Sequence, residues 1–325
     1  MAVERSPAAQ LKAVMWPLRH ENQWRSTLTD SEGYLPLQEG LRLYYRVIGT
    51  GPRTVVIPAA TGLAADLESL ARGRRVVFYD QRGRGRSDVD PDESHIWIDY
   101  EVQDIEAIRL HFSLEKLSII GWSYMGAISA LYTASHPAHV DRLVLMCAIP
   151  PWSDAPYNDP EARAKKVDER IDHEGAKQLE VMQQQGLETS DPEKYCREYH
   201  RVYLPRQMGK PQALTRMRSD PCAFANEWPH NKAKNFPPVI TQWDWRQEVA
   251  SAQTPTLVIH GSEDLIPEDA SREWATSLPQ ARLFTIPGSG HFPHLEVPDL
   301  YFSAVDQFLN GEWPKGSEVV DDDAT

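Results

Sequence analysis

Ser123 lies where an apolar run of the sequence meets a helical run, and a hydroxyl at such a junction can act as a nucleophile. Residues 117–121 are apolar and strand-like, and residues 126–136 have the composition of a helix. A serine on a sharp strand-to-helix turn holds its hydroxyl at the mouth of a sheet, beside the N–H of the next residue. Acyl transfer requires this arrangement, because it needs a nucleophile close to an oxyanion donor. Met125 takes the place of the second glycine that is usual in this motif, which makes the motif less specific.

An aspartate and a histidine follow Ser123 along the chain, each in the loop after a predicted strand. Residues 255–261 form an apolar run that precedes Asp264, and residues 281–286 form another that precedes His291. A histidine can take the proton of a serine, and an aspartate can orient the imidazole and stabilise its charged form. The order of the three residues and their positions after strands therefore predict a catalytic triad of Ser123, Asp264 and His291. Its chemistry needs neither a cofactor nor a metal, and we expect none.

The segments that must position these residues alternate between strand and helix patterns. The apolar runs are short and suit buried parallel strands, and the segments between them have helical periodicity. We predict a hairpin over residues 33–48, strands over 54–57, 76–79, 117–121, 141–147, 255–261 and 281–286, and helices over 63–72, 100–112 and 126–136. Such alternation is the signature of an α/β fold with a mostly parallel central sheet flanked by helices.

The chain resembles the α/β-hydrolase family, in the branch of proline iminopeptidases and esterases. The segments that carry the resemblance are Asp80-Gln-Arg-Gly-Arg-Gly-Arg-Ser87, the turn at Ser123, His-Gly-Ser-Glu-Asp264, and Gly290-His291 with Glu296-Val-Pro298. The first segment is similar to proline iminopeptidases in particular; its three arginines are expected in ion pairs or in solvent. The resemblance implies the α/β-hydrolase fold, with an inserted and mainly helical cap.

The resemblance also implies the place of an oxyanion hole. One backbone N–H would come from Tyr124, directly after the nucleophile, and the other from Ala60, after the strand at 54–57. Family members usually carry His-Gly where this chain has Pro58 and Ala59. Proline iminopeptidases show a His-Gly-Gly-Pro-Gly loop and a Gly-Gly-Ser-Trp-Gly turn, and this chain has neither. These departures argue against release of an amino-terminal proline.

Several alternatives remain beside the main interpretation. Glu263 rivals Asp264 as the acid, and so does Asp154, because some enzymes of this fold place the acid after the preceding strand. Epoxide and haloalkane hydrolases use an aspartate at the position of Ser123, which argues against both. We predict a serine hydrolase that cleaves a small ester, lactone or amide through an acyl-enzyme on Ser123. A proline iminopeptidase-type aminopeptidase or a carbon–carbon bond hydrolase is the alternative, and a non-enzymatic ligand receptor is less favoured.

The alternation of strand and helix patterns breaks at residues 148–151 and resumes near Pro255. We predict an N-terminal extension over residues 1–30, a core over 31–148 and 252–312, and a cap over 149–251. The cap is rich in aromatic residues, which could line a pocket. The candidates for substrate binding are Trp122, at the turn before the nucleophile, and Trp152, Trp228 and Trp243 in the cap. Carboxylates that could hold a substrate ammonium group are Asp154, Glu198, Glu227 and Asp244.

The overall composition limits the partners of this 325-residue chain. Its formal net charge of −13 argues against nucleic acid, and it has no apolar run of the roughly 18 residues that a membrane span needs. The first thirty residues lack the apolar stretch of a secretory signal. Three widely spaced cysteines suggest neither a disulfide framework nor a zinc site, so we expect the protein to reside in a reducing cytoplasm. The partner that we expect is a small-molecule substrate. Residues 313–325 are acidic and are predicted to form a solvated, disordered tail. The sequence does not indicate an oligomeric state.

Overall fold

The computed structural model describes residues 29–38, 40–89, 97–223 and 242–321. Most of the predicted N-terminal extension, together with Glu227 and Trp228, lies outside these ranges.

An eight-stranded sheet forms the centre of the molecule, with the strand order β1-β2-β4-β3-β5-β6-β7-β8. The strands are β1 (Asp30–Pro36), β2 (Arg42–Ile48), β3 (Thr54–Pro58), β4 (Arg75–Tyr79), β5 (Leu117–Trp122), β6 (Val140–Met146), β7 (Thr256–Gly261) and β8 (Ala281–Ile286). The β1–β2 hairpin pairs antiparallel with β4, and the pairs from β4 to β8 are parallel. The predicted α/β fold class and mostly parallel sheet are confirmed. Because β3 to β8 run in one direction, the loops after them meet at one edge of the sheet.

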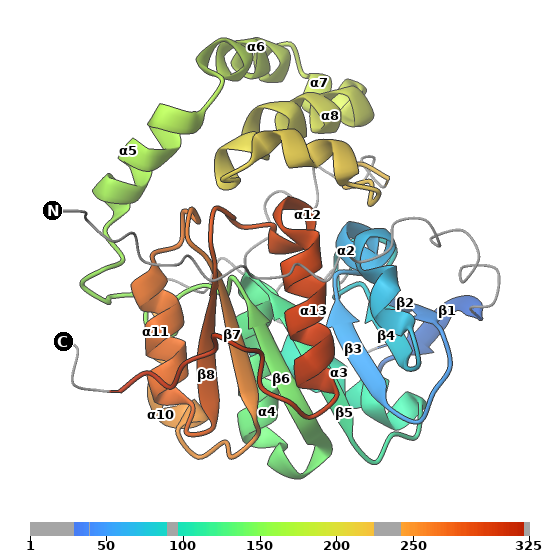
Figure 1. Ribbon diagram of the computed structural model, residues 1–325. Helices are drawn as coiled ribbons and strands as arrows, with labels where there is room; N and C mark the ends of the chain where they lie inside the picture. Colours follow the sequence, from blue (N-terminus) through green and yellow to red (C-terminus); the bar gives the residue numbers. More distant parts are fainter. Residues whose placement is uncertain (1–28, 39, 90–96, 224–241, 322–325) are drawn as a thin grey trace, which may run out of the picture.

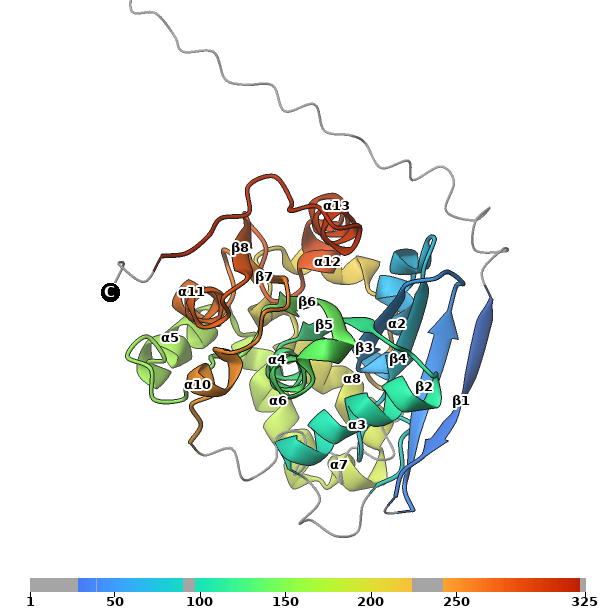
Figure 2. The ribbon, with the colours of Figure 1, turned by 90° about the horizontal axis from the view of Figure 1, so that it is seen from below.

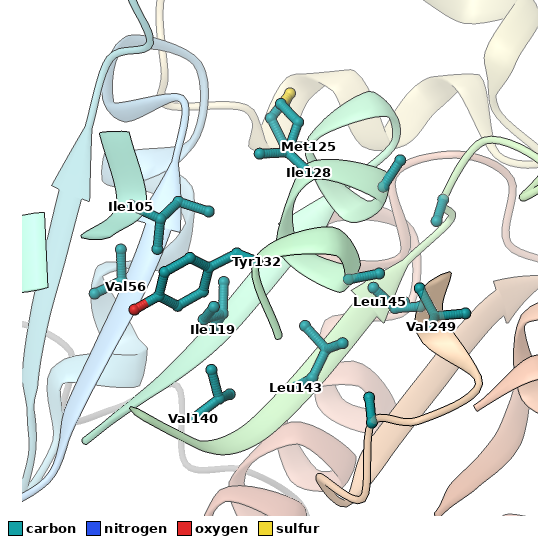
Figure 3. Packing of buried hydrophobic residues seen from close by; sticks show 14 of the residues in the cluster. Val56, Ile105, Ile119, Met125, Ile128, Tyr132, Val140, Leu143, Leu145 and Val249 are labelled. Carbon is teal, nitrogen blue, oxygen red and sulfur yellow. The ribbon is translucent and has the colours of Figure 1, made fainter. Parts of the chain in front are cut away.

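Helices cover both faces of the sheet (Figures 1 and 2). The core helices are α2 (Ala60–Leu67), η2 (Glu68–Ala71), α3 (Ile98–His111), α4 (Tyr124–Ser135), η4 (Pro137–His139), α10 (Arg246–Val249), α11 (Glu268–Ser277), α12 (Pro293–Glu296) and α13 (Pro298–Leu309). Side chains alternate along each strand, so Val56 packs toward α3 and α4 while Val55 packs toward α2 and α13. Figure 3 shows the first of these two clusters, with Tyr132 of α4 lying beside Val56 and Ile105.

The described part of the segment between β6 and β7 is mainly helical and lies above the loops that follow the strands (Figure 1). Its helices are α5 (Pro160–Arg170), α6 (His173–Gln184), α7 (Leu187–Ser190), α8 (Pro192–Tyr203), η5 (Pro205–Gln207) and η6 (Pro211–Arg216). This placement supports our proposal that residues 149–251 form a cap. The end of that range also packs into the core, because Val249 of α10 is fully buried in the cluster around α4.

The prediction that the cysteines form no disulfide is wrong. Cys196 of α8 is bonded to Cys222, with their Cα atoms 5.8 Å apart, and Cys147 is buried and unpaired. The bond forms because the chain after α8 passes through η5 and η6 and then turns back, which brings Cys222 next to Cys196. The spacing of the cysteines in the sequence does not reveal this path. The cysteines therefore do not argue for a reducing compartment.

The prediction of a disordered tail from residue 313 is wrong as far as residue 321. The ring of Trp313 lies 5.1 Å from that of Phe308, and Glu318 exchanges two backbone hydrogen bonds of 2.8 and 2.9 Å with Leu283 of β8. An edge strand offers unpaired N–H and C=O groups, and the tail satisfies part of this edge. In the described parts of the chain, no helix combines the length and apolarity needed to cross a membrane.

Candidate active site

Ser123 occupies a strained turn between β5 and α4, as the sequence predicts. Its backbone has φ 55° and ψ −124°, a region that residues with a side chain rarely adopt. A Cβ atom at Gly121 would lie 2.5 Å from the carbonyl oxygen of Met125, and one at Gly126 would lie 2.7 Å from Cβ of Ala148. The turn therefore needs both glycines. Met125, in place of the usual second glycine, is buried in the core cluster and does not obstruct the turn.

Asp264 and His291 meet at the carboxyl ends of β7 and β8. Nδ1 of His291 lies 2.9 and 3.1 Å from the two carboxylate oxygens of Asp264, and both residues are buried. Burial alone would raise the pKa of Asp264, but the imidazole of His291 and the N–H of Ile266 lower it below its ordinary value. The carboxylate therefore stays ionised and can hold the imidazole by a charge-assisted hydrogen bond.

The two rival acids have other surroundings. Glu263 pairs with Arg170 at 3.4 Å and is half-exposed. Asp154 is exposed and accepts a hydrogen bond of 3.1 Å from Ser153. The geometry therefore favours Asp264 as the partner of His291.

Trp122 connects the serine turn to the histidine loop. Its indole N–H donates to the carbonyl oxygen of His291 at 2.9 Å, and the two rings lie 5.2 Å apart. Because Trp122 directly precedes Ser123, this contact fixes the nucleophile turn relative to the His291 loop.

The two proposed oxyanion donors occupy equivalent positions in the fold. Ala60 is the first residue of α2 and Tyr124 is the first residue of α4. N–H groups in the first turn of a helix have no carbonyl partner within that helix and carry its positive end. Ala59 adopts φ 73°, a left-handed conformation that costs an alanine about 1 kcal/mol more than a glycine.

The Asp80–Ser87 segment supports the start of α2. The buried carboxylate of Asp80 accepts hydrogen bonds of 2.7 Å from both the N–H and the hydroxyl of Thr61, and one of 3.1 Å from the N–H of Arg86. These bonds hold the residue next to Ala60 in place. The arginines of the segment form ion pairs, as expected: Arg82 with Asp104, Arg84 with Glu101 and Arg86 with Glu32.

The two predicted cap tryptophans that the structure describes, Trp152 and Trp243, pack where the cap joins the core. Trp243 donates to the carbonyl oxygen of Pro150 at 2.9 Å and stacks on Trp245, and the guanidinium of Arg246 lies 4.1 Å from the ring centroid of Trp152. These contacts give Trp152 and Trp243 a packing role.

A different group of apolar residues connects the cap to the His291 loop, and the sequence analysis missed it. It joins residues of η5 and η6 and their flanks to Trp122 and to the chain after His291. Its members are Leu204, Met208, Ala213, Leu214, Met217, Phe292 and Leu295, with Trp122 packed against them. These residues were missed because aliphatic side chains on short turns carry no chemical signature.

Two groups of described side chains could in principle offer three ligand atoms to a metal. One consists of Cys147, Asp264 and His291, whose ligand atoms lie within 4.8 Å of one another. Burial and the nearby Asp264 raise the pKa of the Cys147 thiol well above its ordinary value, and a neutral thiol is a poor ligand. In the other group, formed with His200, the sulfurs of Cys196 and Cys222 are bonded to each other. Neither arrangement favours a metal.

The family model described as the alpha/beta hydrolase fold matches residues 61–298. The chain belongs to the α/β-hydrolase family. This α/β-hydrolase is 25% identical to a proline iminopeptidase of Thermoplasma volcanium. The match covers 86% of this chain and 96% of the Thermoplasma protein. The solved structure of an esterase from Exiguobacterium antarcticum matches with a TM-score of 0.64 at 17% identity, covering 86% of this chain and 99% of that one. The 2-hydroxy-6-oxo-6-phenylhexa-2,4-dienoate hydrolase of Rhodococcus sp. strain RHA1 also matches at 0.64, with 21% identity and coverage of 87% and 99%. The resemblance to the α/β-hydrolases and their proline iminopeptidase/esterase branch is thereby confirmed.

A buried histidine beside the site of this α/β-hydrolase should make its stability depend on pH. Burial lowers the pKa of His294 from 6.5 to about 3, and nearby His291 acts in the same direction. Between these two values the unfolded chain binds a proton that the folded protein excludes, so stability decreases as the pH is lowered. We expect the free energy of unfolding to fall by a few kcal/mol from pH 6.5 towards 3, since a tenfold change in a dissociation constant corresponds to about 1.4 kcal/mol.

Urea unfolding of the wild type and of His294→Gln across this pH range would measure the effect. The variant should show a weaker decrease in stability than the wild type. Equal decreases would contradict the assignment of the proton to His294.

Proposed function

We propose that this α/β-hydrolase cleaves a small ester, lactone or amide through an acyl-enzyme formed on Ser123. The observation that carries the proposal is the buried His291–Asp264 pair, joined through Trp122 to the strained turn that presents Ser123. A serine hydroxyl is a weak nucleophile at neutral pH, and an oriented imidazole is the base that activates it.

In the first half of the reaction, Oγ of Ser123 attacks the carbonyl carbon of the substrate. Nδ1 of His291 is engaged by Asp264, so Nε2 takes the hydroxyl proton. The carbonyl oxygen becomes negatively charged and is stabilised by the N–H groups of Ala60 and Tyr124. The intermediate then collapses, the bond to the leaving group breaks, and Nε2 donates its proton to that group.

In the second half, water replaces the leaving group. His291 takes a proton from the water, whose oxygen attacks the acyl carbon, and the bond to Ser123 breaks as the serine regains the proton. Asp264 stabilises the imidazolium in both halves without becoming protonated itself.

The charges of the cap favour an ester, lactone or simple amide over a peptide with a free amino terminus. A proline iminopeptidase must bind an α-ammonium group, which needs available carboxylates above the nucleophile. Glu198 pairs with Arg201 at 2.7 Å, and Asp244 pairs with Arg246 at 2.6 Å. The described cap residues that pack against Trp122 and Phe292, the neighbours of Ser123 and His291 in the chain, are instead apolar, with Met208 among them.

Substrate comparison separates the two functions. We expect an aryl acetate or butyrate to turn over well and a prolyl-arylamide poorly or not at all, because two of the candidate cap carboxylates, Glu198 and Asp244, are paired with arginines. The test measures kcat/KM for both substrates under one set of conditions, with Ser123→Ala as the blank.

The arylamide decides between the two functions, because aryl esters are intrinsically reactive. The peptidase named among the relatives, together with the Asp80–Ser87 segment, supports the alternative. An arylamide kcat/KM above about 10⁴ M⁻¹s⁻¹, the low end of ordinary enzyme efficiency, would promote the peptidase and end the esterase interpretation.

A further inference from the structure

Glu296 is a buried carboxylate with no part in the proposed reaction. It is the last residue of α12, five positions after His291, and is only 3% exposed. A buried carboxylate is costly unless several hydrogen bonds compensate for the loss of water. The partners of Glu296 therefore show what the residue is for.

One carboxylate oxygen of Glu296 holds the loop that carries His291. Oε1 accepts hydrogen bonds from the N–H of Gly290 at 2.9 Å and from the N–H of Phe292 at 3.2 Å, and the hydroxyl of Ser289 lies at 3.5 Å. The two N–H groups flank His291 on either side in sequence. Oε1 thus fixes the backbone on both sides of the residue that must take the proton of Ser123.

The other carboxylate oxygen holds the cap. Oε2 accepts a hydrogen bond of 2.8 Å from the N–H of Lys210, in the turn between η5 and η6. In the same turn, the carbonyl oxygen of Gln207 accepts from the N–H of His291 at 2.8 Å. A Cβ atom at Gly290 would lie 2.4 Å from that carbonyl oxygen, so the two backbones are in direct contact.

The same turn of the cap also contacts the loop that carries Asp264. A Cβ atom at Gly209 would lie 2.8 Å from Cβ of Glu263, the residue before Asp264. The guanidinium of Arg170, at the end of α5, donates to the carbonyl oxygen of Glu263 at 2.8 Å. The cap therefore touches the loops of both the acid and the base.

We propose that Glu296 is a positioning residue that locks the cap turn 207–210 and the His291 loop into one arrangement, so that the cap contributes to the placement of the catalytic histidine. This inference rests on the proposed role of His291 as the base for Ser123. The turn is then held in place, because it cannot move away without breaking the hydrogen bonds from His291 to Gln207 and from Lys210 to Glu296.

Glu296→Gln removes one acceptor while keeping the size of the side chain. A glutamine must direct its NH₂ donor either at the N–H groups of the loop or at the N–H of Lys210, so one set of contacts is lost. We expect kcat for an aryl ester to fall about 10²-fold with little change in KM, which is typical of a misplaced catalytic group. The rate at which a fluorophosphonate labels Ser123 should fall in parallel, since labelling also needs His291 to take the serine proton.

Asp66→Asn is the matched control. Asp66 of α2 also fastens the cap, by accepting from the N–H groups of Arg218 at 2.7 Å and Ser219 at 3.2 Å, and its hydrogen bonds within the described residues go to this cap segment. The control is expected to lose stability in urea unfolding while its labelling rate stays within about threefold of the wild type, because the substitution leaves the hydrogen bonds of Glu296 to the His291 loop and to Lys210 in place.

Gly209→Ala tests the same coupling between the cap turn 207–210 and the His291 loop by a substitution in the cap. It provides the test if Glu296→Gln does not fold. Its new Cβ must push the turn away from Glu263, so the labelling rate should fall although the substitution lies in the cap. The inference is overturned if folded Glu296→Gln or Gly209→Ala labels Ser123 at the wild-type rate, or if Asp66→Asn slows labelling as much as Glu296→Gln does. A wild type that does not label at Ser123 would instead refute the proposed function.

Discussion

Ser123→Ala is expected to lower kcat/KM for an aryl ester by at least about 10⁴-fold, because loss of the nucleophile leaves only the oxyanion donors and substrate binding. The fold should be preserved, since alanine carries the same Cβ as serine and meets the same backbone strain at φ 55°. Steady-state rates of purified protein, with circular dichroism to verify folding, would measure the change.

Ser135→Ala provides the control for this result. Ser135 is the last residue of α4, the helix that starts directly after Ser123; it is exposed and donates to the carbonyl oxygen of Leu131 at 2.9 Å. It should retain wild-type activity. A Ser123→Ala enzyme within tenfold of the wild type would show that another residue or an activated water performs the attack.

Asp264→Asn is expected to lower kcat by about 10⁴-fold while the protein stays folded. The buried carboxylate accepts from Nδ1 of His291 at 2.9 Å, and an amide there can present its NH₂ group and hold the wrong tautomer. The imidazolium formed when Ser123 attacks would also lose its counter-ion in a buried environment.

Asp154→Asn is the matched control for the acid. Asp154 is exposed and hydrogen-bonded to its neighbour Ser153, so this variant should keep its activity. The reverse result, with Asp264→Asn active and Asp154→Asn inactive, would transfer the role of the acid to the loop after β6.

The parts of the fold that follow from local periodicity could be predicted. Buried parallel strands are short apolar runs, and they appear in the structure where the sequence predicts them, with β8 at residues 281–286. Parallel strands also bring the loops after them to one edge. For this reason, Asp264 and His291 could be expected to meet although 26 residues separate them in the chain.

The features that depend on the path of the chain between distant segments could not be predicted. The Cys196–Cys222 bond requires the chain after α8 to turn back, and the order of residues 313–321 requires a free edge on β8. One partner of Glu296, the N–H of Lys210, lies in a cap turn more than eighty residues earlier, and nothing in the sequence near Lys210 indicates that contact. These arrangements arise from tertiary packing, which neither spacing nor composition encodes.

The role of the cap tryptophans was predicted from composition alone, and composition does not distinguish a pocket from a packed interface. Trp243 donates a hydrogen bond to Pro150 and stacks on Trp245, and the ring of Trp152 packs against the guanidinium of Arg246. Large aromatic side chains bury extensive apolar surface, so they are common wherever a cap joins a core.

Labelling with a fluorophosphonate probe tests most directly whether Ser123 is an activated nucleophile. The probe forms a stable ester with such a serine, and peptide mass spectrometry locates it. We predict one label per chain, on Ser123, that is lost in Ser123→Ala and forms much more slowly in Asp264→Asn. Labelling of a different residue while Ser123 remains unmodified would contradict it.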